Sequence, residues 1–444
     1  MNDLLIANGN VLTVSPDGAR ADVLRRYDVL VRGQRIEAVQ PAGRIDRSHF
    51  RTIIDATDKV VMPGFVNCHA HTPMVLFRGL AEDVSIDRWF NEFIWPLENN
   101  LTAEDVYWGM LLGAAEMIRA GITTVADHYF HMDRGGEAID QIGMRGVLGW
   151  AMFSSLGKPA LDQTDTFIRE WHGAANGRIT TIVAPHAPYT CDDDFLMAAG
   201  RIARRHGVPV HIHAAEVIAQ TEASLAKRGI TPIEILEQTG VLLPGTIIAH
   251  ACGVTPDDVE RMASAGVGVA TAPKTYLKLG MDITPVRDLR AVGIPVGLAT
   301  DGVVSNNTLD LWEAMRLTAM LQKDRALDPE VLTIPEALAI ATHESAKVVG
   351  LGGKVGAVAA GYLADLIVVD TSGLHHQPLH SITASLVYSA MASDVVHTII
   401  DGKVVMRDRR ILTIDVDDVI ANVSHQNRRL AQRVPGQRIQ TYHP

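Results

Sequence analysis

The stretch Pro63-Gly64-Phe65-Val66-Asn67-Cys68-His69-Ala70-His71 follows an apolar run, residues 60–62, and contains two histidines two residues apart. Side chains alternate between the two faces of a strand, so His69 and His71 are expected to lie on the same face. Two imidazoles at the end of a buried strand can bind one metal ion. A lone His-x-His pair is weak evidence for such a site, and its weight comes from segments further along the chain.

The middle of the chain alternates between short apolar strands and longer helical stretches. With the strand before His69 counted first, the other predicted strands span residues 123–126, 145–150, 180–184, 208–212, 246–249, 267–270 and 294–299. Predicted helices between them include residues 103–120, 195–206, 231–239, 257–265 and 309–322. Eight such units over about 290 residues favour an α/β fold, a (β/α)8 TIM-type barrel, over a doubly wound sheet. The strands are apolar throughout, as expected when both faces are buried.

Both ends of the chain have a different pattern, of short strands and tight turns. Near the C-terminal end, residues 364–370 predict a strand, and residues 395–400 and 403–406, joined by Asp401-Gly402, predict a hairpin. The two ends therefore predict one small β-sandwich domain. Residues 1–60 form its N-terminal part, 61–360 the barrel, and 361–444 its C-terminal part plus a tail.

The composition indicates which binding partners and which cellular compartment to expect. The chain has 444 residues, a formal net charge of -11 and 20% charged residues, with no basic stripe. No nucleic-acid partner is expected, because nothing is arranged to neutralise phosphates. No apolar run approaches the roughly 20 residues of a membrane span, and no secretory signal is visible. Three cysteines, an odd and sparse set, are typical of a reducing compartment, so we expect a cytoplasmic protein that contacts no membrane.

Unusual polar residues fall where the predicted barrel strands end. They are His69, His71, His213, Glu216, His250 and Asp301. Each alone has an ordinary explanation, as a satisfied core histidine or a helix-end carboxylate. Burying such groups costs several kcal/mol unless they find partners, and active sites of barrels form at the C-terminal ends of the strands. Their shared position therefore predicts a single site.

The residue types predict a metal site with one ion. We expect His69, His71, His213 and Asp301 to bind a divalent ion, with a water in the remaining position. Nitrogen and oxygen ligands with an open position suit zinc, with iron or manganese as alternatives. Such an ion lowers the pKa of its bound water from about 15.7 to around 7. No lysine ends the predicted fourth strand, residues 179–185, so a carbamylated lysine bridging two metals is not indicated.

Three residues are predicted to act in catalysis. Asp301 could take the proton of the water while it ligates the ion, and His250 could hydrogen-bond the hydroxide or the developing oxyanion. Glu216 could carry a proton to a ring nitrogen and then to the departing group. The alternative for Glu216 is a carboxylate in the first turn of a helix. His211 shares the inward face of His213 and is interpreted as a packing residue, not a ligand.

This pattern resembles the amidohydrolase superfamily, and most closely its branch of 5'-methylthioadenosine/S-adenosylhomocysteine deaminases and chlorotriazine hydrolases. The resemblance covers nearly the whole chain. It is carried by residues 63–71, 121–127, 213–216, His250, 300–307 and 361–370. It implies a barrel hydrolase that uses a metal ion and takes a small-molecule substrate.

Two segments are similar to those of the nucleoside deaminases in that branch. Trp95-Pro96-Leu97-Glu98 resembles the segment whose glutamate binds the ribose hydroxyls, which implies that role for Glu98. Ala184-Pro185-His186-Ala187-Pro188-Tyr189 resembles the segment whose histidine contacts the purine ring, which implies that role for His186. Their alternatives are a surface glutamate and a turn histidine. Trp89 is either a wall of the substrate pocket or a core aromatic.

The resemblance implies hydrolytic deamination of an adenine nucleoside such as 5'-methylthioadenosine, S-adenosylhomocysteine or adenosine, with hydroxide attacking C6 and ammonia leaving.

One segment departs from the family pattern. Where the family usually has His-Asn-Pro-x-Ser-Asn-x-Lys-Leu, this chain has Thr271-Ala272-Pro273-Lys274-Thr275-Tyr276-Leu277-Lys278-Leu279. Because that loop borders the substrate, the alternative is an aminohydrolase or chlorohydrolase of a free N-heterocycle: a guanine-like base, a pterin, a cytosine-like base or an s-triazine. A second alternative is a non-catalytic scaffold on the same fold. We also expect a homo-oligomer.

Overall fold

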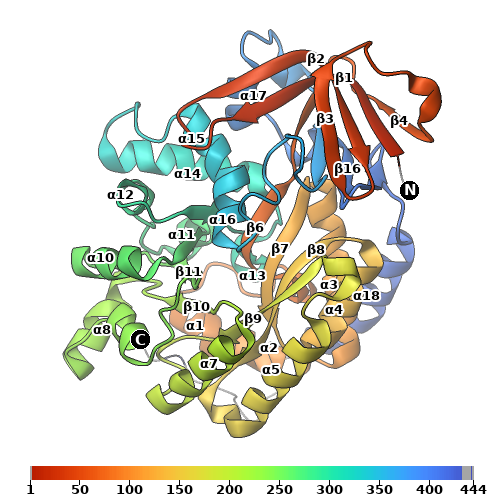
Figure 1. Ribbon diagram of the computed structural model, residues 1–444. Coiled ribbons are helices and arrows are strands. Elements are labelled where there is room, and N and C mark those ends of the chain that lie inside the picture. Colours follow the sequence, from red (N-terminus) through yellow and green to blue (C-terminus); the bar gives the residue numbers. More distant parts are fainter. Residues whose placement is uncertain (1–2, 433–441, 443–444) are drawn as a thin grey trace.

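The computed structural model of this chain describes residues 3–432 and 442. Its strands form one mixed sheet of nine strands and two parallel sheets of four and five strands. In Figure 1 the nine-stranded sheet lies at the top of the molecule, and the parallel strands lie below it among their helices.

The two parallel sheets together supply the barrel. Their strands are β6 (Phe65–His71), β7 (Ile122–Tyr129), β8 (Arg145–Met152), β9 (Ile179–Pro185), β10 (His211–Ala214), β11 (Ile247–His250), β12 (Gly268–Thr271), β13 (Val296–Leu298) and β14 (Asp301–Gly302). The strand order is β14-β6-β7-β8-β9 in one sheet and β10-β11-β12-β13 in the other.

The two parallel sheets join at both ends. β13 and β14 are consecutive parts of one segment, and β13 pairs with β12 while β14 pairs with β6. At the other junction, Val183 of β9 bridges Val210, the residue directly before β10. The strands therefore close into a ring in chain order, with β13 and β14 sharing the eighth place. The predicted (β/α)8 barrel is confirmed.

Burial on both faces explains why these segments form parallel strands. Every residue of β7, β10, β11 and β12 is buried. Strands buried on both faces are mostly apolar, but His71, His128 and His250 lie at or next to the C-terminal ends of their strands. Those ends are where the functional side chains must find partners.

Helices surround the barrel strands. They include α3 (Ala103–Arg119), α4 (Met132–Ile142), α5 (Gly157–Trp171), α7 (Asp193–His206), α8 (Ile218–Arg228), α9 (Pro232–Gln238), α10 (Pro256–Ala265), α11 (Pro273–Leu279) and α14 (Leu311–Ala326). The five helices predicted from the sequence correspond to α3, α7, α9, α10 and α14. Capping boxes begin three of them, with Thr102, Thr231 and Thr255 as the capping residues. Such caps satisfy the free amides of the first turn.

The nine-stranded sheet is assembled from both ends of the chain, as the sequence predicts. Its strands are β1 (Asp3–Val14), β2 (Ala21–Arg32), β3 (Arg35–Pro41), β4 (Thr52–Asp55), β5 (Val60–Pro63), β15 (Leu366–Val369), β16 (Val395–Ile400), β17 (Lys403–Arg407) and β18 (Arg410–Ile411). β5 lies between β1 and β15 and so joins the two ends. The predicted hairpin is β16–β17, and its turn residues Asp401 and Gly402 have φ of 54° and 76°. These left-handed values are those that an Asp-Gly hairpin turn adopts.

The apolar run before the His-x-His pair is not part of the barrel. It forms β5 in the nine-stranded sheet, and the first barrel strand, β6, begins only at Phe65. Gly64 lies between the two strands. A Cβ atom at Gly64 would lie 2.2 Å from Cγ2 of Thr123, so no larger residue fits where the chain passes from one sheet into the other.

After the sheet the chain returns to the barrel. Helix α18 (Val416–Leu430) lies beside α3 (Figure 1). There Arg429 pairs with the buried Asp105. Tyr442 is buried, and its ring stacks on Phe90 with the ring centroids 5.1 Å apart. The remaining residues of the predicted tail, 433–441 and 443–444, lie outside the described part of the chain, as do residues 1 and 2. Within the described part, no helix is both long and apolar enough to cross a membrane.

A buried ion-pair cluster connects the barrel to the nine-stranded sheet. Arg145, the first residue of β8, donates hydrogen bonds of 2.7 and 3.0 Å to Asp365 and of 3.0 Å to Asp401. The exposed fraction of each of these residues is 5% or less. Asp365 precedes β15 and Asp401 begins the hairpin turn, so one guanidinium neutralises two carboxylates of the small sheet.

Replacing Arg145 by alanine is expected to destabilise the protein strongly. The change leaves two buried carboxylates without a cation, which costs about 3–5 kcal/mol when one partner of a buried pair is removed. Equilibrium urea unfolding measures the loss. Arg169→Ala, which removes the exposed partner of the partly buried Asp165, is the control and should cost no more than about 1 kcal/mol, because Arg205 and His206 still pair with Asp165. Equal losses in the two variants would contradict a connecting role for Arg145.

Candidate active site

One cavity opens at the C-terminal ends of the barrel strands. The space inside it is about 660 Å³, which includes the part that is open to solvent. The polar residues that line it are His71, Glu98, His128, His186, His213, Glu216, His250, Thr275, Asp301 and Ser305. Aromatic and aliphatic side chains form much of the rest, among them Trp89, Phe90, Phe130 and Phe153. A largely apolar cavity with a few convergent polar groups is typical of a small-molecule site.

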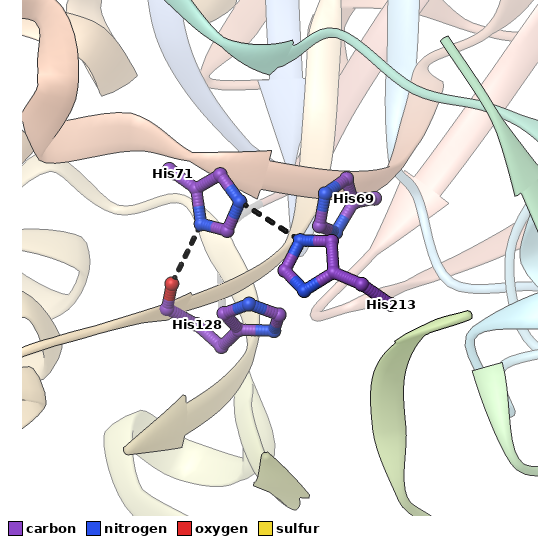
Figure 2. A group of neighbouring side chains, drawn as sticks. All are labelled: His69, His71, His128 and His213. Carbon is purple, nitrogen blue, oxygen red and sulfur yellow. Dashed lines mark hydrogen bonds between the residues drawn. The ribbon is translucent and has the colours of Figure 1, made fainter. Parts of the chain in front are cut away.

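Four histidines meet at the base of this cavity. Figure 2 shows His69 and His71 on β6 facing His128, from β7, and His213, from β10. One ring nitrogen from each of these four lies within 4.8 Å of the others, and the Nε2 atoms of His71 and His213 are 3.2 Å apart. We refer to these four residues as the histidine cluster.

Backbone carbonyls orient two members of the histidine cluster. Nδ1 of His71 lies 3.0 Å from the carbonyl oxygen of His128, and Nδ1 of His213 lies 2.8 Å from that of His186. A carbonyl oxygen can only accept, so both Nδ1 atoms carry the proton. The Nε2 atoms are then left with free lone pairs. This arrangement is the usual support of a metal-ligating histidine.

His69 presents a buried nitrogen that nothing in the described part of the chain satisfies. Its Nδ1 contacts Nε2 of His211 at 2.9 Å, while its own Nε2 is buried without a hydrogen-bond partner. That Nε2 lies 3.4 Å from Oδ1 of Asp301, and Nε2 of His71 lies 3.6 Å from the same oxygen. Buried polar atoms are rarely left unpaired. The converging set of three imidazoles and one carboxylate therefore fits a divalent metal ion.

The electrostatics of the site match neutral imidazoles beside a charged carboxylate. Burial, reinforced by the neighbouring histidines, holds the pKa values of His69 and His213 well below their usual range. Neutral imidazole is the form that binds metal. Burial raises the pKa of Asp301, but His250, His71 and His213 more than offset this, and its pKa is lowered overall.

Backbone strain accompanies two of the site residues. His250 has a φ of 82° and Asp301 a φ of 59°, both in the left-handed region that residues with side chains rarely adopt. His250 is the last residue of β11 and Asp301 is the first residue of β14, and both side chains line the cavity. Strain of this kind costs of order 1–3 kcal/mol per residue and is concentrated at functional sites.

Glu216 is a buried carboxyl group whose pKa lies close to neutral pH. Burial raises its pKa to about 7, against the lowering effect of hydrogen bonds from Tyr189 and Gln220. The hydroxyl of Tyr189 donates to Oε1 of Glu216 at 2.9 Å, and the backbone amide of Glu216 donates to Gln220 at 3.0 Å. A carboxyl with this pKa can both accept and release a proton near pH 7.

The three predicted substrate-binding residues all line the same cavity. Glu98 is buried rather than at the surface, accepts a 2.7 Å hydrogen bond from Tyr129, and has its pKa raised by burial to about 7. His186 stacks on Phe153 with ring centroids 4.7 Å apart. Trp89 has an exposed fraction of 6%, so it is a cavity wall and a buried aromatic at once.

His128 was not predicted from the sequence. Both of its ring nitrogens are buried without a hydrogen-bond partner among the described residues, which makes it a further potential ligand or hydrogen-bonding group. The second strand was predicted to end at residue 126, whereas β7 continues to Tyr129. The Asp127-His128 pair that directly follows the apolar core of this strand is the signal that could have located it.

A second group of potential ligands lies away from the cavity, near the small sheet. It consists of His375, His376 and Asp394. Oδ2 of Asp394 contacts Nε2 of both histidines, at 2.9 and 3.1 Å, and accepts from the amide of Met391 at 2.7 Å. These hydrogen bonds account for the group without an ion.

A barrel that brings imidazoles and a carboxylate together at the ends of its strands defines a metal-dependent hydrolase. The chain belongs to the amidohydrolase family, which matches residues 60–405. The predicted resemblance to this family is confirmed.

Three relatives of this chain are all named as deaminases. A 5-methylthioadenosine/S-adenosylhomocysteine deaminase of Pelotomaculum thermopropionicum is 41% identical over 438 residues, covering 98% of this chain and 100% of the relative. A 5'-deoxyadenosine deaminase of Methanosarcina mazei is 38% identical over 438 residues, with 98% and 100% covered. Among solved structures, a zinc-bound adenosine deaminase from Xanthomonas campestris has a TM-score of 0.88 and 31% identity, over 96% of this chain and 98% of that chain.

The likeness extends further in fold than in sequence. A zinc complex of an atrazine chlorohydrolase from Arthrobacter aurescens has a TM-score of 0.85 over 96% of this chain and 100% of that chain. Its identity is 23%, so it shows a shared fold alone.

The ligand assignment predicts different metal contents for two carboxylate variants. Asp301→Asn should weaken retention of a divalent ion by about 10-fold or more, because it removes the charged member of the ligand set. Glu216→Gln is the matched control: it makes the same chemical change in the same cavity, and it should leave the metal content unchanged. Both are measured by elemental analysis after dialysis against a weak chelator. Full metal content in Asp301→Asn would rule out Asp301 as a ligand.

Proposed function

We propose that this chain is a hydrolytic deaminase of adenine nucleosides that uses one divalent ion, zinc, to add water to C6 of the purine and release ammonia. The observation that carries the proposal is the cavity itself. It combines the histidine cluster and Asp301 with a buried proton carrier, Glu216, and a further buried carboxylate, Glu98. The names of the relatives, up to 41% identical over nearly the full length, support the same activity.

His69, His71, His213 and Asp301 would hold the ion, which when bound supplies a Lewis acid that lowers the pKa of water. Asp301 then accepts a proton from the attacking water. Glu216 delivers a proton to the purine ring nitrogen next to C6 and afterwards to the departing amino group, a role for which its pKa of about 7 is suited. His250 donates a hydrogen bond to the oxygen that adds to C6.

Glu98 would bind the ribose. An ionised carboxylate can accept from two vicinal hydroxyls at once, and hydrogen bonds to a charged group are the stronger ones. The hydroxyl of Tyr129 already holds one of its oxygens. His186, stacked on Phe153, would then contact the purine ring. A free heterocycle has no sugar, and it would offer the buried Glu98 no hydroxyl to bind beyond that of Tyr129.

The walls of the cavity indicate which 5' substituents fit best. Among the described residues that line it, none is Lys or Arg, and the walls include Ile86, Phe90, Phe130 and Phe153. A buried carboxylate without a cation is costly. The carboxylate at the amino-acid end of S-adenosylhomocysteine would therefore bind less favourably than an uncharged 5'-methylthio or 5'-deoxy group.

A panel of four nucleosides tests the proposal. Adenosine, 5'-deoxyadenosine, 5'-methylthioadenosine and S-adenosylhomocysteine are each mixed with zinc-loaded protein, and the loss of adenine absorbance is followed. Turnover is expected for the first three, with a kcat/KM for S-adenosylhomocysteine that is lower by about 10-fold, because an unpaired polar group costs about 1–3 kcal/mol. Glu216→Gln is the blank, with kcat reduced by about 100-fold or more. No turnover of any of the four would end the proposal.

Glu98→Gln separates a nucleoside enzyme from one that acts on free bases. Loss of the charged partner of the ribose should raise KM for the preferred nucleoside by about 10-fold, since hydrogen bonds to charged groups contribute about 1.5–3 kcal/mol. Because the pKa of Glu98 is about 7, KM of the unmodified protein should fall as pH rises through 7, and this dependence should vanish in Glu98→Gln. An unchanged KM in the variant would favour a free heterocycle as substrate.

A further inference from the structure

A tyrosine near the C-terminal end of the chain packs against the wall of the cavity. Tyr442 has an exposed fraction of 2%. Its ring stacks on Phe90 with an angle of 15° between the rings, and it meets the ring of Tyr189 edge-on, with the centroids 5.3 Å apart. Phe90 lines the cavity and Tyr442 does not, so Tyr442 can act on the cavity only through other side chains.

The backbone of Tyr442 is held by the residue that follows Phe90. The amide of Tyr442 donates to Oδ1 of Asn91 at 3.0 Å, and Nδ2 of Asn91 donates to the carbonyl oxygen of Tyr442 at 3.3 Å. These two bonds satisfy both main-chain polar groups of Tyr442. Phe90 and Asn91 belong to one short helix, Trp89–Ile94, so a single segment beside the cavity binds both the backbone and the ring of Tyr442.

The hydroxyl of Tyr442 reaches a residue that holds Glu216. Nε2 of the buried Gln220 donates to the phenolic oxygen at 3.2 Å, and Oε1 of the same side chain accepts from the backbone amide of Glu216 at 3.0 Å. A backbone amide can only donate, so its bond fixes which end of the Gln220 side chain faces Tyr442. Tyr189, which meets the ring of Tyr442, donates to Oε1 of Glu216. Tyr442 therefore contacts a partner of the backbone of Glu216 and a partner of its side chain.

We propose that Tyr442 is a positioning residue of the active site, a role that rests on the proposed function. Its ring keeps Phe90 in place against the substrate, and its hydroxyl keeps Gln220 in the orientation that holds Glu216.

The place of Tyr442 in the fold supports this role. Phe90 lies in the segment after β6, Tyr189 in the segment after β9, and Gln220 in α8, which follows β10. These segments are far apart in the sequence, and one side chain from the far end of the chain contacts all of them. Interiors are close-packed, so loss of a buried ring leaves its neighbours without support on that side.

A double-mutant cycle on folding tests the contact between the two rings without any substrate. Phe90→Leu, Tyr442→Leu and the double variant are unfolded in urea, and the losses in midpoint are compared. Because stacked rings interact beyond their burial, the loss in the double variant should be smaller than the sum of the single losses. Tyr388→Leu, at a tyrosine outside the cavity, is the control and should give additive losses with Phe90→Leu.

Additive losses for Phe90→Leu and Tyr442→Leu would overturn the proposal. This result does not depend on which substrate the protein uses, so failure of the contact and failure of the proposed function are separate outcomes.

A kinetic arm separates the ring of Tyr442 from its hydroxyl. Tyr442→Leu removes both, and it should raise KM for the preferred nucleoside by about 5-fold, in line with the strength of an aromatic pair. Tyr442→Phe keeps the ring, so KM should return to that of the unmodified protein. Its kcat should be lower by about 3–10-fold, because the buried Nε2 of Gln220 loses its acceptor.

Simple destabilisation would lower the amount of active protein in Tyr442→Leu and leave its KM unchanged. An unchanged KM in Tyr442→Leu would therefore overturn the proposal. So would a KM in Tyr442→Phe as high as in Tyr442→Leu, or an unchanged kcat in Tyr442→Phe.

Discussion

The hydrogen bonds from Nδ1 of His71 and His213 to backbone carbonyls are the contacts on which the site depends. Each joins a side chain on one barrel strand to the main chain of the adjacent strand or of the loop that follows it. Because β6 and β7, and β9 and β10, are held in register by the barrel, the carbonyls of His128 and His186 stay in place. The directions of the two Nε2 lone pairs are therefore set by the closure of the barrel itself.

This arrangement carries an energetic cost. Beyond the histidine cluster, His211 and His250 are also buried, and burial is the largest cause of the lowered pKa of each. Neutral imidazoles without partners are unfavourable in an apolar interior. An ion bound by His69, His71, His213 and Asp301 would offset part of this cost, and binding of the proposed ion would then also stabilise the fold. The strained backbone at His250 and Asp301 adds to what the surrounding structure must offset.

Much of the fold follows from local sequence pattern. Apolar runs of strand length alternating with helical stretches predicted the barrel, because each unit has to bury both faces of its strand. The division at Gly64 could not be read in the same way. β5 and the first residues of β6 are both apolar and nearly contiguous. They are separated by tertiary contacts, since β5 pairs with β15, β6 pairs with β7, and Thr123 lies close to Gly64. The closure of the eighth strand through β13 and β14 likewise depends on pairing with β12 and β6 rather than on composition.

The candidate site, like the fold, could be predicted from the sequence only in part. The structure brings His69, His71, His213, Glu216, His250 and Asp301 into one region. They could be identified because each lies at the end of a predicted strand or shortly after it. His128 was missed because the predicted strand stopped at residue 126, and its position depends on the true length of β7. The contact of 3.3 Å between the hydroxyl of Tyr276 and Nδ1 of His250 could not be predicted, since it depends on how α11 packs against β11.

The position of α11 suggests how one metal centre can serve different substrates. The proposed ligands stand on barrel strands whose register cannot change without disrupting the sheet. Thr275 and Tyr276 instead stand on a short helix beyond β12, where Thr275 reaches the cavity and Tyr276 reaches His250. Substitutions there alter the surroundings of His250 and Asp301 while the ligands remain in place. A barrel of this kind can therefore keep its hydrolytic chemistry while the segment after the seventh strand changes, and the departure of residues 271–279 from the family pattern is compatible with an intact metal site.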